Sequence, residues 1–257
     1  MSKQRTEGRF AGQVVLVTGG AGGLGSAIAA HFFDEAACVV VADCDVERAS
    51  VVAEQLGSAA YPMKLEVSDE SSWVSVFDEI ERLRGTPDVL VNNAGVFVPN
   101  VPFEQMSVEL WRRHFAVNAE GTFLGCKHAL LRMKARGSGA IVNMASGFAL
   151  RPQATASAYC ASKAAVWMTT RTAAAAAGPY GIRVNAVLPG AVPTDMLRGN
   201  LAAGDDEQAY FALLAQHAAL GKLASAADIA RAVAFLADPA NNAITGVALP
   251  VDAGNLL

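Results

Sequence analysis

Short apolar runs alternate along this chain with longer segments that have helical spacing or are rich in alanine. Most of the runs are apolar at every position, as in residues 14–17. Strands that are buried on both faces have this pattern, and helical connections between them make the strands parallel. We therefore expect an α/β fold, a doubly wound seven-stranded parallel sheet with helices on both faces. Strands are predicted at residues 14–17, 38–42, 60–65, 89–91, 140–144, 182–187 and 247–251.

The segments between these strands predict helices, and no linker or repeat divides the chain. We expect one domain at residues 10–257, after a polar tail at residues 1–9. Residues 191–222 form a connection much longer than the usual ~2–6 residues, and they are expected to be either a loose surface segment or a lid over a site. Helices are predicted at residues 24–36, 46–56, 70–83, 157–177 and 228–237, with one long helix inside residues 107–136 that Ser107 caps.

The composition and net charge of the chain exclude several classes of function. The chain has 257 residues, of which 53% are apolar and 17% charged, so it can bury a large core. The net charge of −4 offers no basic surplus for nucleic acid, and no apolar run has the ~18–20 residues that cross a bilayer. The start lacks an apolar signal segment, and the four cysteines form no CxxC pair, so a cytoplasmic protein with reduced thiols is expected. The four histidines lack the spacing of metal ligands, so no metal is expected.

A glycine-rich loop, residues 18–25, follows the first strand directly and precedes a helix. Glycines let the chain turn sharply and let a pyrophosphate approach the backbone, while the helix offers unpaired N–H groups and the positive end of its dipole. Tight turns also use glycine, but the strand–loop–helix context favours a dinucleotide site.

Asp43 ends the second strand, 18 residues after Gly25. A carboxylate there can accept hydrogen bonds from both hydroxyls of an adenosine ribose. It would repel a 2′-phosphate, and no Arg or Lys stands at positions 20–22 or 44. The expected cofactor is therefore NAD and not NADP. The alternative is a turn-forming Asp before Cys44 and Asp45.

Tyr159 and Lys163 are four residues apart in a predicted helix and share one face. A neighbouring ammonium and an oxidised nicotinamide favour the phenolate, so a lowered tyrosine pKa is expected. Such a tyrosine can act as general acid or base in hydride transfer. A tyrosine and a lysine at this spacing are common on helix surfaces, but the glycine-rich loop in the same chain favours a catalytic role for them.

The chain resembles the classical short-chain dehydrogenases/reductases from Gly12 to Gly254. One such motif alone would be weak evidence for the family, but the order and spacing of several motifs together are specific to it. The segments that carry the resemblance are TGGAGGLG (18–25), NNAG (92–95), VNAEG (117–121), a serine thirteen residues before Tyr159, YCASK (159–163), RVNAVLPG (183–190) and ITG…VDAG (244–254).

The resemblance implies a Rossmann domain that transfers a hydride between NAD(H) and an alcohol or ketone. It makes Tyr159 the general acid/base, and Lys163 the residue that lowers its pKa and holds the nicotinamide ribose. Ser146 would orient the substrate oxygen, and Asn118 would support a proton relay. The implied cofactor-binding residues are Gly19, Gly23, Leu24, Gly25, Asp43, Glu66, Val67, Asn93, Ala94, Gly95, Tyr159, Lys163, Pro189, Gly190, Val192 and Thr194.

Three positions depart from the family pattern. Glu66 stands where an Asp is usual, which puts its role beside adenine in doubt. Ala145 replaces a serine often found before the catalytic one, and Ala253 replaces a glycine.

The substrate is less defined by the sequence. The candidate pocket residues are mostly apolar, with Arg151 and Arg198 as the exceptions, so a neutral, fairly hydrophobic secondary alcohol or ketone of cyclic or steroid-like kind is expected. The alternative is that these side chains pack the core. The candidates are Phe97, Phe148, Leu150, Met196, Leu197, Tyr210 and Phe211.

Two other functions compete, and the family adds an expected homotetramer. A 3-oxoacyl reductase with an acyl-carrier partner is disfavoured by Asp43, because those enzymes typically use NADPH. A non-catalytic NAD-binding regulator would have little reason to keep Asn118, Ser146, Tyr159 and Lys163 together.

Overall fold

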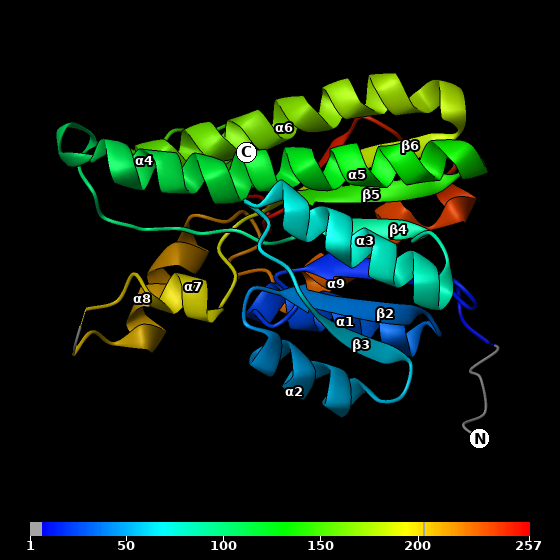
Figure 1. The fold of residues 1–257 in the computed structure, drawn as a ribbon. Helices are drawn as coiled ribbons and strands as arrows, with labels where there is room; N and C mark the ends of the chain where they lie inside the picture. The colour runs from blue at the N-terminus through cyan, green and yellow to red at the C-terminus, as the bar shows by residue number, and fades with distance from the viewer. Residues whose placement is uncertain (1–6, 203) are drawn as a thin grey trace.

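The computed structural model describes residues 7–202 and 204–257, and one seven-stranded parallel sheet runs through them in the order β3-β2-β1-β4-β5-β6-β7 (Figure 1). The predicted fold class is confirmed. Most predicted strand ends agree to within one residue, and β6 runs two residues further. The strands are β1 Val14–Thr18, β2 Cys38–Asp43, β3 Ala60–Lys64, β4 Val89–Asn92, β5 Gly139–Met144, β6 Ile182–Pro189 and β7 Ala248–Val251.

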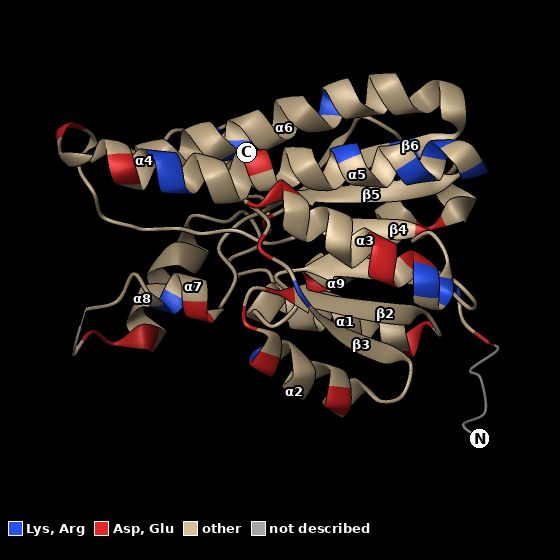
Figure 2. Cartoon of the chain, in the orientation of Figure 1, with Lys and Arg blue, Asp and Glu red and all other residues tan. Residues whose placement is uncertain are grey.

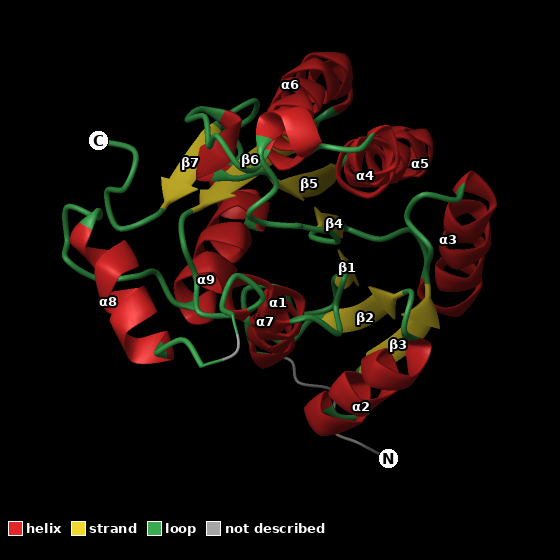
Figure 3. Cartoon of the chain, turned by 90° about the vertical axis from the view of Figure 1, so that its left-hand side faces the viewer, coloured by secondary structure: helices red, strands yellow, loops and turns green. Residues whose placement is uncertain are grey.

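Helices cover both faces of the sheet (Figure 3). One face carries α1 (Gly23–Asp34), α2 (Val46–Leu56) and α9 (Ala226–Ala237). The other carries α3 (Glu70–Arg84), α4 (Val108–His114) followed by α5 (Gly121–Arg136), and α6 (Ser157–Ala177). Short 3-10 turns occur at Phe103–Gln105, Gly147–Ala149, Gly178–Tyr180 and Pro239–Asn241.

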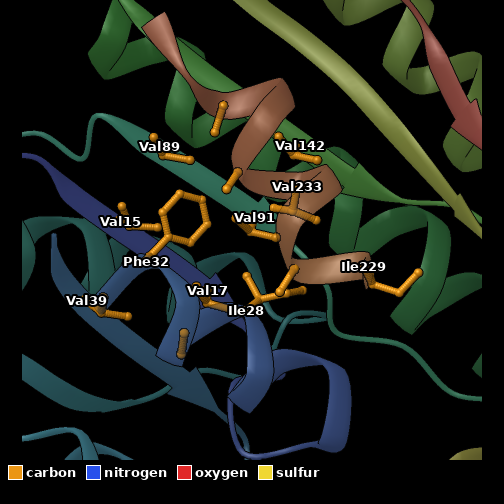
Figure 4. Close-up of a cluster of buried hydrophobic side chains, with 14 of the residues drawn as sticks. Val15, Val17, Ile28, Phe32, Val39, Val89, Val91, Val142, Ile229 and Val233 are labelled. Atoms are coloured by element: carbon orange, nitrogen blue, oxygen red, sulfur yellow. The ribbon is translucent and has the colours of Figure 1, made fainter. Parts of the chain in front are cut away.

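Alternate strand residues enter two separate cores. On β1, Val15 and Val17 pack toward α1 and α9, where Phe32 and Val233 lie (Figure 4), while Val14 and Leu16 pack toward α3 and α5. Burial on both faces is why the strands read as continuous apolar runs. The edge strand β3 tolerates Pro62, whose missing N–H a central strand would need.

The predicted long helix contains a change of helical type. It begins at α4 (Val108–His114), passes through a π-helix at Phe115–Glu120, and continues as α5 (Gly121–Arg136). Ser107 caps its start as expected, its Oγ accepting from the Leu110 N–H over 3.1 Å. Single π turns often occur at functional sites, and this one carries Asn118.

The long connection after β6 is partly helical. It contains α7 (Asp195–Arg198) and α8 (Glu207–Gln216), which lie together at one end of the molecule (Figure 1). Asp206 caps α8 by accepting from the N–H groups of Gln208 and Ala209. These helices are short and have little apolar periodicity, so the sequence pattern did not separate them from loop.

Most of the predicted polar tail, residues 1–6, lies outside the described residues. Arg9 belongs to the fold, since its guanidinium pairs with Glu35 over 2.8 Å and with Asp238 over 3.6 Å. Acidic and basic positions both occur along the helices on the two faces of the sheet, as the ribbon in Figure 2 shows. Within residues 7–202 and 204–257, no helix combines the length and the hydropathy needed to cross a membrane.

Candidate active site

A cavity of about 810 Å³ opens at the carboxyl ends of the strands. The loops after β1, β2, β4, β5 and β6 line it, and α8 contributes one side. The strand order reverses between β1 and β4, which is where doubly wound sheets bind ligands. We call the part near Asp43 the adenosine end and the part near Tyr159 the substrate end.

The glycine-rich loop has the tight geometry that its glycines allow. Gly19 has φ +62°, which favours glycine. A Cβ on Gly25 would lie 2.0 Å from the Gly19 carbonyl oxygen, so no larger residue fits there. Gly22 is the N-cap residue of α1, and no side chain caps this helix start. The first N–H groups of α1 therefore remain available to an anion in the cavity.

Asp43 lies at the adenosine end with its carboxylate held by the backbone. Its Oδ2 accepts from the Ala21 N–H over 3.0 Å, and its Oδ1 accepts from the Asp45 N–H over 3.1 Å. The side chain thus ties β2 to the glycine-rich loop. Sequence reasoning missed Arg48, which lines the same cavity and reaches the Ala21 carbonyl over 3.4 Å. It was missed because the search for basic residues covered only positions 20–22 and 44.

Glu66 and Val67 also line the cavity. The Glu66 carboxylate turns back to Ser68, accepting from its Oγ over 2.7 Å and from its N–H over 3.2 Å. The longer side chain is therefore used to close a turn, and this explains how the departure from Asp is accommodated.

Asn93, Ala94 and Gly95 form the loop after β4 and line the cavity. The Asn93 side chain donates to the carbonyls of Thr18 (2.9 Å) and Gly19 (3.1 Å), so it braces the glycine-rich loop. The Thr18 hydroxyl accepts from the N–H groups of Asn93 and Ala94, both over 3.0 Å. These bonds fix the two loops to each other.

The loop after β6 forms the facing wall, with Pro189, Gly190, Val192 and Thr194 lining the cavity. A Cβ on Gly190 would lie 2.7 Å from the Asp252 Cβ, which requires glycine there. The methyl group of Thr194 would be 3.2 Å from a Cβ on Gly23, so this loop reaches the start of α1.

Tyr159 and Lys163 lie on α6, and Ser146 follows β5, so all three line the substrate end. The Lys163 Nζ is 5.7 Å from the centre of the Tyr159 ring and donates to the Met144 carbonyl over 2.8 Å. Ser146 accepts from the Phe148 N–H over 3.2 Å. The structure brings together the three residues that the sequence grouped.

Loss of water on burial shifts the pKa values of both Tyr159 and Lys163. Desolvation raises the pKa of Tyr159 to about 12, and a hydrogen bond with Ser146 opposes it. Desolvation also lowers the pKa of Lys163 to about 8. Among the protein's own groups, loss of water outweighs the hydrogen bond with Ser146, so these groups by themselves do not produce the lowered Tyr159 pKa that was expected.

Asn118 uses its side chain to hold the loop after β4 against α6. Its Nδ2 donates to the Val96 carbonyl and to the Ser162 Oγ, both over 3.0 Å, and its Oδ1 accepts from the Val96 N–H over 2.8 Å. A Cβ on Gly95 would lie 3.2 Å from Oδ1 and 3.4 Å from the Lys163 Nζ. Asn118 is thus within a short distance of the lysine that it was expected to serve.

Aromatic rings surround Tyr159. Phe97 lies 4.6 Å away between ring centres, Phe148 6.4 Å and His114 6.5 Å, the last two edge-to-face. His114 is buried, and sequence reasoning did not select it. Its position four residues before Asn118 on a predicted helix was the available signal, because such residues share a face.

Five of the expected substrate-pocket residues line the cavity, namely Phe97, Phe148, Met196, Leu197 and Tyr210. Leu150, Phe211 and Arg198 are not among the lining residues, and that expectation is corrected. Leu150 is exposed, Phe211 packs beside Tyr210, and Arg198 pairs with Glu207 over 3.2 Å.

The family profile described as "Enoyl-(Acyl carrier protein) reductase" matches residues 19–255. The chain belongs to the short-chain dehydrogenase/reductase family. It is 40% identical to the cis-4-hydroxycyclohexanecarboxylate dehydrogenase of Sinomonas cyclohexanicum over 248 residues, 95% of this chain and 97% of the relative. It is 36% identical to the cyclopentanol dehydrogenase of a Comamonas species over 250 residues, 96% and 98% of the two chains.

A solved structure has the same fold throughout. The 3-ketoacyl-(acyl-carrier-protein) reductase of Brucella melitensis, complexed with NADH, matches with a TM-score of 0.90 and 31% identity, covering 96% of this chain and 99% of that one. As a member of this family with dehydrogenase relatives, the protein is an oxidoreductase that acts on the CH–OH group of small-molecule alcohols. The alternative of a non-catalytic regulator is thereby set aside.

Proposed function

We propose that this oxidoreductase transfers a hydride between NAD(H) and a fairly hydrophobic, ring-bearing secondary alcohol or its ketone. The observation that carries the proposal is the position of Ser146, Tyr159 and Lys163. They line one cavity that has an anion-binding loop at one end and aromatic side chains at the other.

The dinucleotide, when bound, supplies the nicotinamide that accepts or returns the hydride. Residues that fit it include the open start of α1 for the pyrophosphate and Asp43 for the adenosine ribose. Ser146 and Tyr159 then hydrogen-bond the substrate oxygen. Tyr159 takes the hydroxyl proton during oxidation and returns it during reduction.

Lys163 and the charge of the oxidised cofactor together make this proton transfer possible. Because burial holds the pKa of Tyr159 at about 12, one buried amine is not enough to yield a phenolate at neutral pH. A second positive charge next to the hydroxyl shifts the equilibrium toward the phenolate. We infer that the base forms mainly when oxidised cofactor is bound.

Asp43 supports NAD over NADP. Its carboxylate is fixed by two backbone N–H groups, so it cannot easily turn away from a 2′-phosphate. Arg48 lies on the same side of the cavity, but its hydrogen bond to the Ala21 carbonyl keeps it beside the loop. The expected selectivity comes from repulsion between the fixed carboxylate and the phosphate.

The substrate class follows from the aromatic walls and from the relatives. The rings of Phe97 and Phe148 flank Tyr159, which favours a flat or ring-shaped apolar body next to the reacting carbinol. The relatives include enzymes named for a hydroxycyclohexanecarboxylate and for cyclopentanol. Both of these compounds have a ring that carries a secondary hydroxyl.

A 3-oxoacyl reductase is the second candidate, favoured by the fold shared with the Brucella melitensis reductase. A panel assay separates the two. Purified protein is incubated with NAD⁺ or NADP⁺ and cyclic alcohols, or with NADPH and an acetoacetyl thioester, and absorbance of the reduced cofactor is followed. We expect turnover of cyclic alcohols with NAD⁺. Turnover of the thioester alone, with NADPH, would reverse the assignment.

We also propose a cytoplasmic homotetramer, in line with the family. Apolar side chains exposed along α4, α5 and α6, among them Trp111, Phe123, Leu131 and Met168, support an assembly that covers them. Light scattering of the purified protein tests the subunit number.

A further inference from the structure

Two arginine side chains line the substrate end of the cavity, Arg113 from α4 and Arg151 after β5. Both are exposed, and neither forms an ion pair with an acidic side chain in residues 7–202 and 204–257. Arg198, the last residue of α7, pairs instead with Asp195 and Glu207. The two lining arginines therefore leave positive charge at the substrate end.

The acidic residues that line the cavity either lie at its other end or are held by other partners. Asp43 and Glu66 lie at the adenosine end. Asp252 accepts from the backbone N–H groups of Gly254 and Leu256, both over 2.9 Å, and Asp195 pairs with Arg198. The substrate end thus favours a ligand with a negative group.

Arg151 is linked to the reacting centre through one aromatic ring. Its guanidinium carbon is 5.9 Å from the centre of the Phe148 ring, and that ring meets the Tyr159 ring edge-to-face at 6.4 Å. An apolar substrate body along Phe148 would have one end at the Tyr159 hydroxyl and the other near Arg151.

The Arg151 guanidinium is held in place by an uncharged carbonyl and an aromatic ring, neither of which neutralises its charge. Its Nη1 donates to the Asn255 backbone carbonyl over 3.3 Å, a contact with an uncharged group. Stacking on Phe148 adds a second restraint. An arginine has five N–H donors in a planar fork, so most remain free for a carboxylate.

We propose that Arg151 binds a carboxylate of the substrate, so that the enzyme acts on a hydroxy monocarboxylate whose carbinol and carboxylate are separated by a ring-sized apolar spacer. This inference rests on the proposed function and replaces the neutral substrate expected from the sequence.

The test compares two probes of the same shape, of which one carries a negative charge and the other is neutral. Initial rates with NAD⁺ are measured for 4-hydroxycyclohexanecarboxylate and for its neutral carboxamide, each as cis and trans isomer. The proteins are wild type, Arg151→Gln, Arg151→Lys and Arg113→Gln. Arg171→Gln is the matched control, since Arg171 also stacks on an aromatic ring, Trp167, at 5.8 Å but lies outside the cavity.

We expect wild type to prefer the carboxylate, and Arg151→Gln to lower the ratio of kcat/KM for carboxylate over carboxamide by about 10- to 100-fold, the range for a hydrogen bond to a charged group. The change should lie mostly in KM, with Arg151→Lys between the two and Arg171→Gln like wild type. An unchanged ratio in Arg151→Gln, or a larger loss in Arg113→Gln, would overturn the assignment. Turnover of carboxamide and cyclohexanol without preference for the carboxylate rejects this inference alone, whereas absence of turnover with every alcohol rejects the proposed function.

Discussion

The Lys163 ammonium donates a hydrogen bond to the backbone carbonyl of Met144 over 2.8 Å, which ties α6 to the last residue of β5. Ser146 lies two residues beyond that carbonyl. The same bond therefore fixes the distance between the lysine and the strand end that carries the serine. It holds a buried charge with one neutral partner, so Lys163 serves the site at a cost to the stability of the fold.

The first prediction concerns that cost. The folded state lowers the Lys163 pKa from 10.5 to about 8, so the unfolded chain binds more protons between these values. The buried ammonium therefore lowers the free energy of unfolding by about 3 kcal/mol below pH 8, and this loss disappears as the pH rises through 10.5. Lys163→Met should abolish turnover. At pH 7 it should also remove this penalty, so its unfolding free energy should equal that of wild type or exceed it by up to about 2 kcal/mol. The gain is smaller than the full penalty because the Met144 carbonyl loses its donor.

Urea unfolding at pH 7 and pH 10 checks this prediction. The difference in unfolding free energy between variant and wild type should shift in favour of wild type at pH 10, because its buried amine is then largely neutral there. A difference that does not depend on pH would contradict the assigned pKa shift.

The second prediction concerns the Tyr159 hydroxyl. Tyr159→Phe keeps the ring that packs 4.6 Å from Phe97 but removes the group that moves the proton. Turnover should fall by about 10²- to 10⁴-fold, with the NAD⁺ dissociation constant nearly unchanged. Tyr210→Phe, in the same cavity, is the control and should stay within a few-fold of wild type. Equal losses in both variants would argue against a special role for Tyr159.

The third prediction is the direction of the pH dependence. With the Tyr159 pKa raised to about 12 by burial, the tyrosine of the free enzyme holds its proton at neutral pH. Alcohol oxidation needs the phenolate and should accelerate as the pH rises from 7 to 10, whereas ketone reduction needs the phenol and should not. Initial rates in both directions, with Tyr159→Phe as a blank, measure this. Oxidation that slows over the same range would not agree with Tyr159 as the base.

The fourth prediction concerns cofactor choice. Asp43→Asn keeps the shape of the side chain but removes the charge that repels a 2′-phosphate. The ratio of kcat/KM for NAD over NADP should fall by about 10- to 100-fold, corresponding to a loss of about 1.4–3 kcal/mol of discrimination. Glu47→Gln, an exposed change in the first turn of α2, should leave the ratio unchanged. A ratio that stays constant in Asp43→Asn would remove the basis for assigning NAD.

The fifth prediction tests His114, which only the structure identified. Its Nδ1–H donates to the Leu110 carbonyl over 2.9 Å, and its Nε2 accepts from the Val98 N–H over 3.2 Å. His114→Phe keeps a ring beside Tyr159 but removes the partner of the part-buried Val98 N–H and a hydrogen bond to the Leu110 carbonyl. We expect a loss of about 1–3 kcal/mol in unfolding free energy and a higher substrate KM, because the loop that carries Phe97 is released. An unchanged KM would limit the role of His114 to stability.

Local signals were sufficient for most of the fold. Runs such as residues 14–17, apolar at every position, identify strands covered on both faces, and Ser107 marks a helix start by its capping chemistry. Short helices without strong periodicity, α7 and α8, gave no such signal. The change to π-helix around Asn118 also has none, because it depends on what the helix packs against.

The sequence by itself determined which chemical groups the protein has and in what order: a glycine-rich loop before a helix, a carboxylate at the end of a strand, and a tyrosine four residues before a lysine. These follow from backbone sterics and helical spacing, which act over a few residues. Only the tertiary structure decided how strongly Tyr159 and Lys163 are desolvated, that Arg48 reaches the glycine-rich loop, and that Arg151 lies beside Phe148. Desolvation and charge pairing depend on groups that are distant in the chain, so they are fixed only when the sheet and its loops come together.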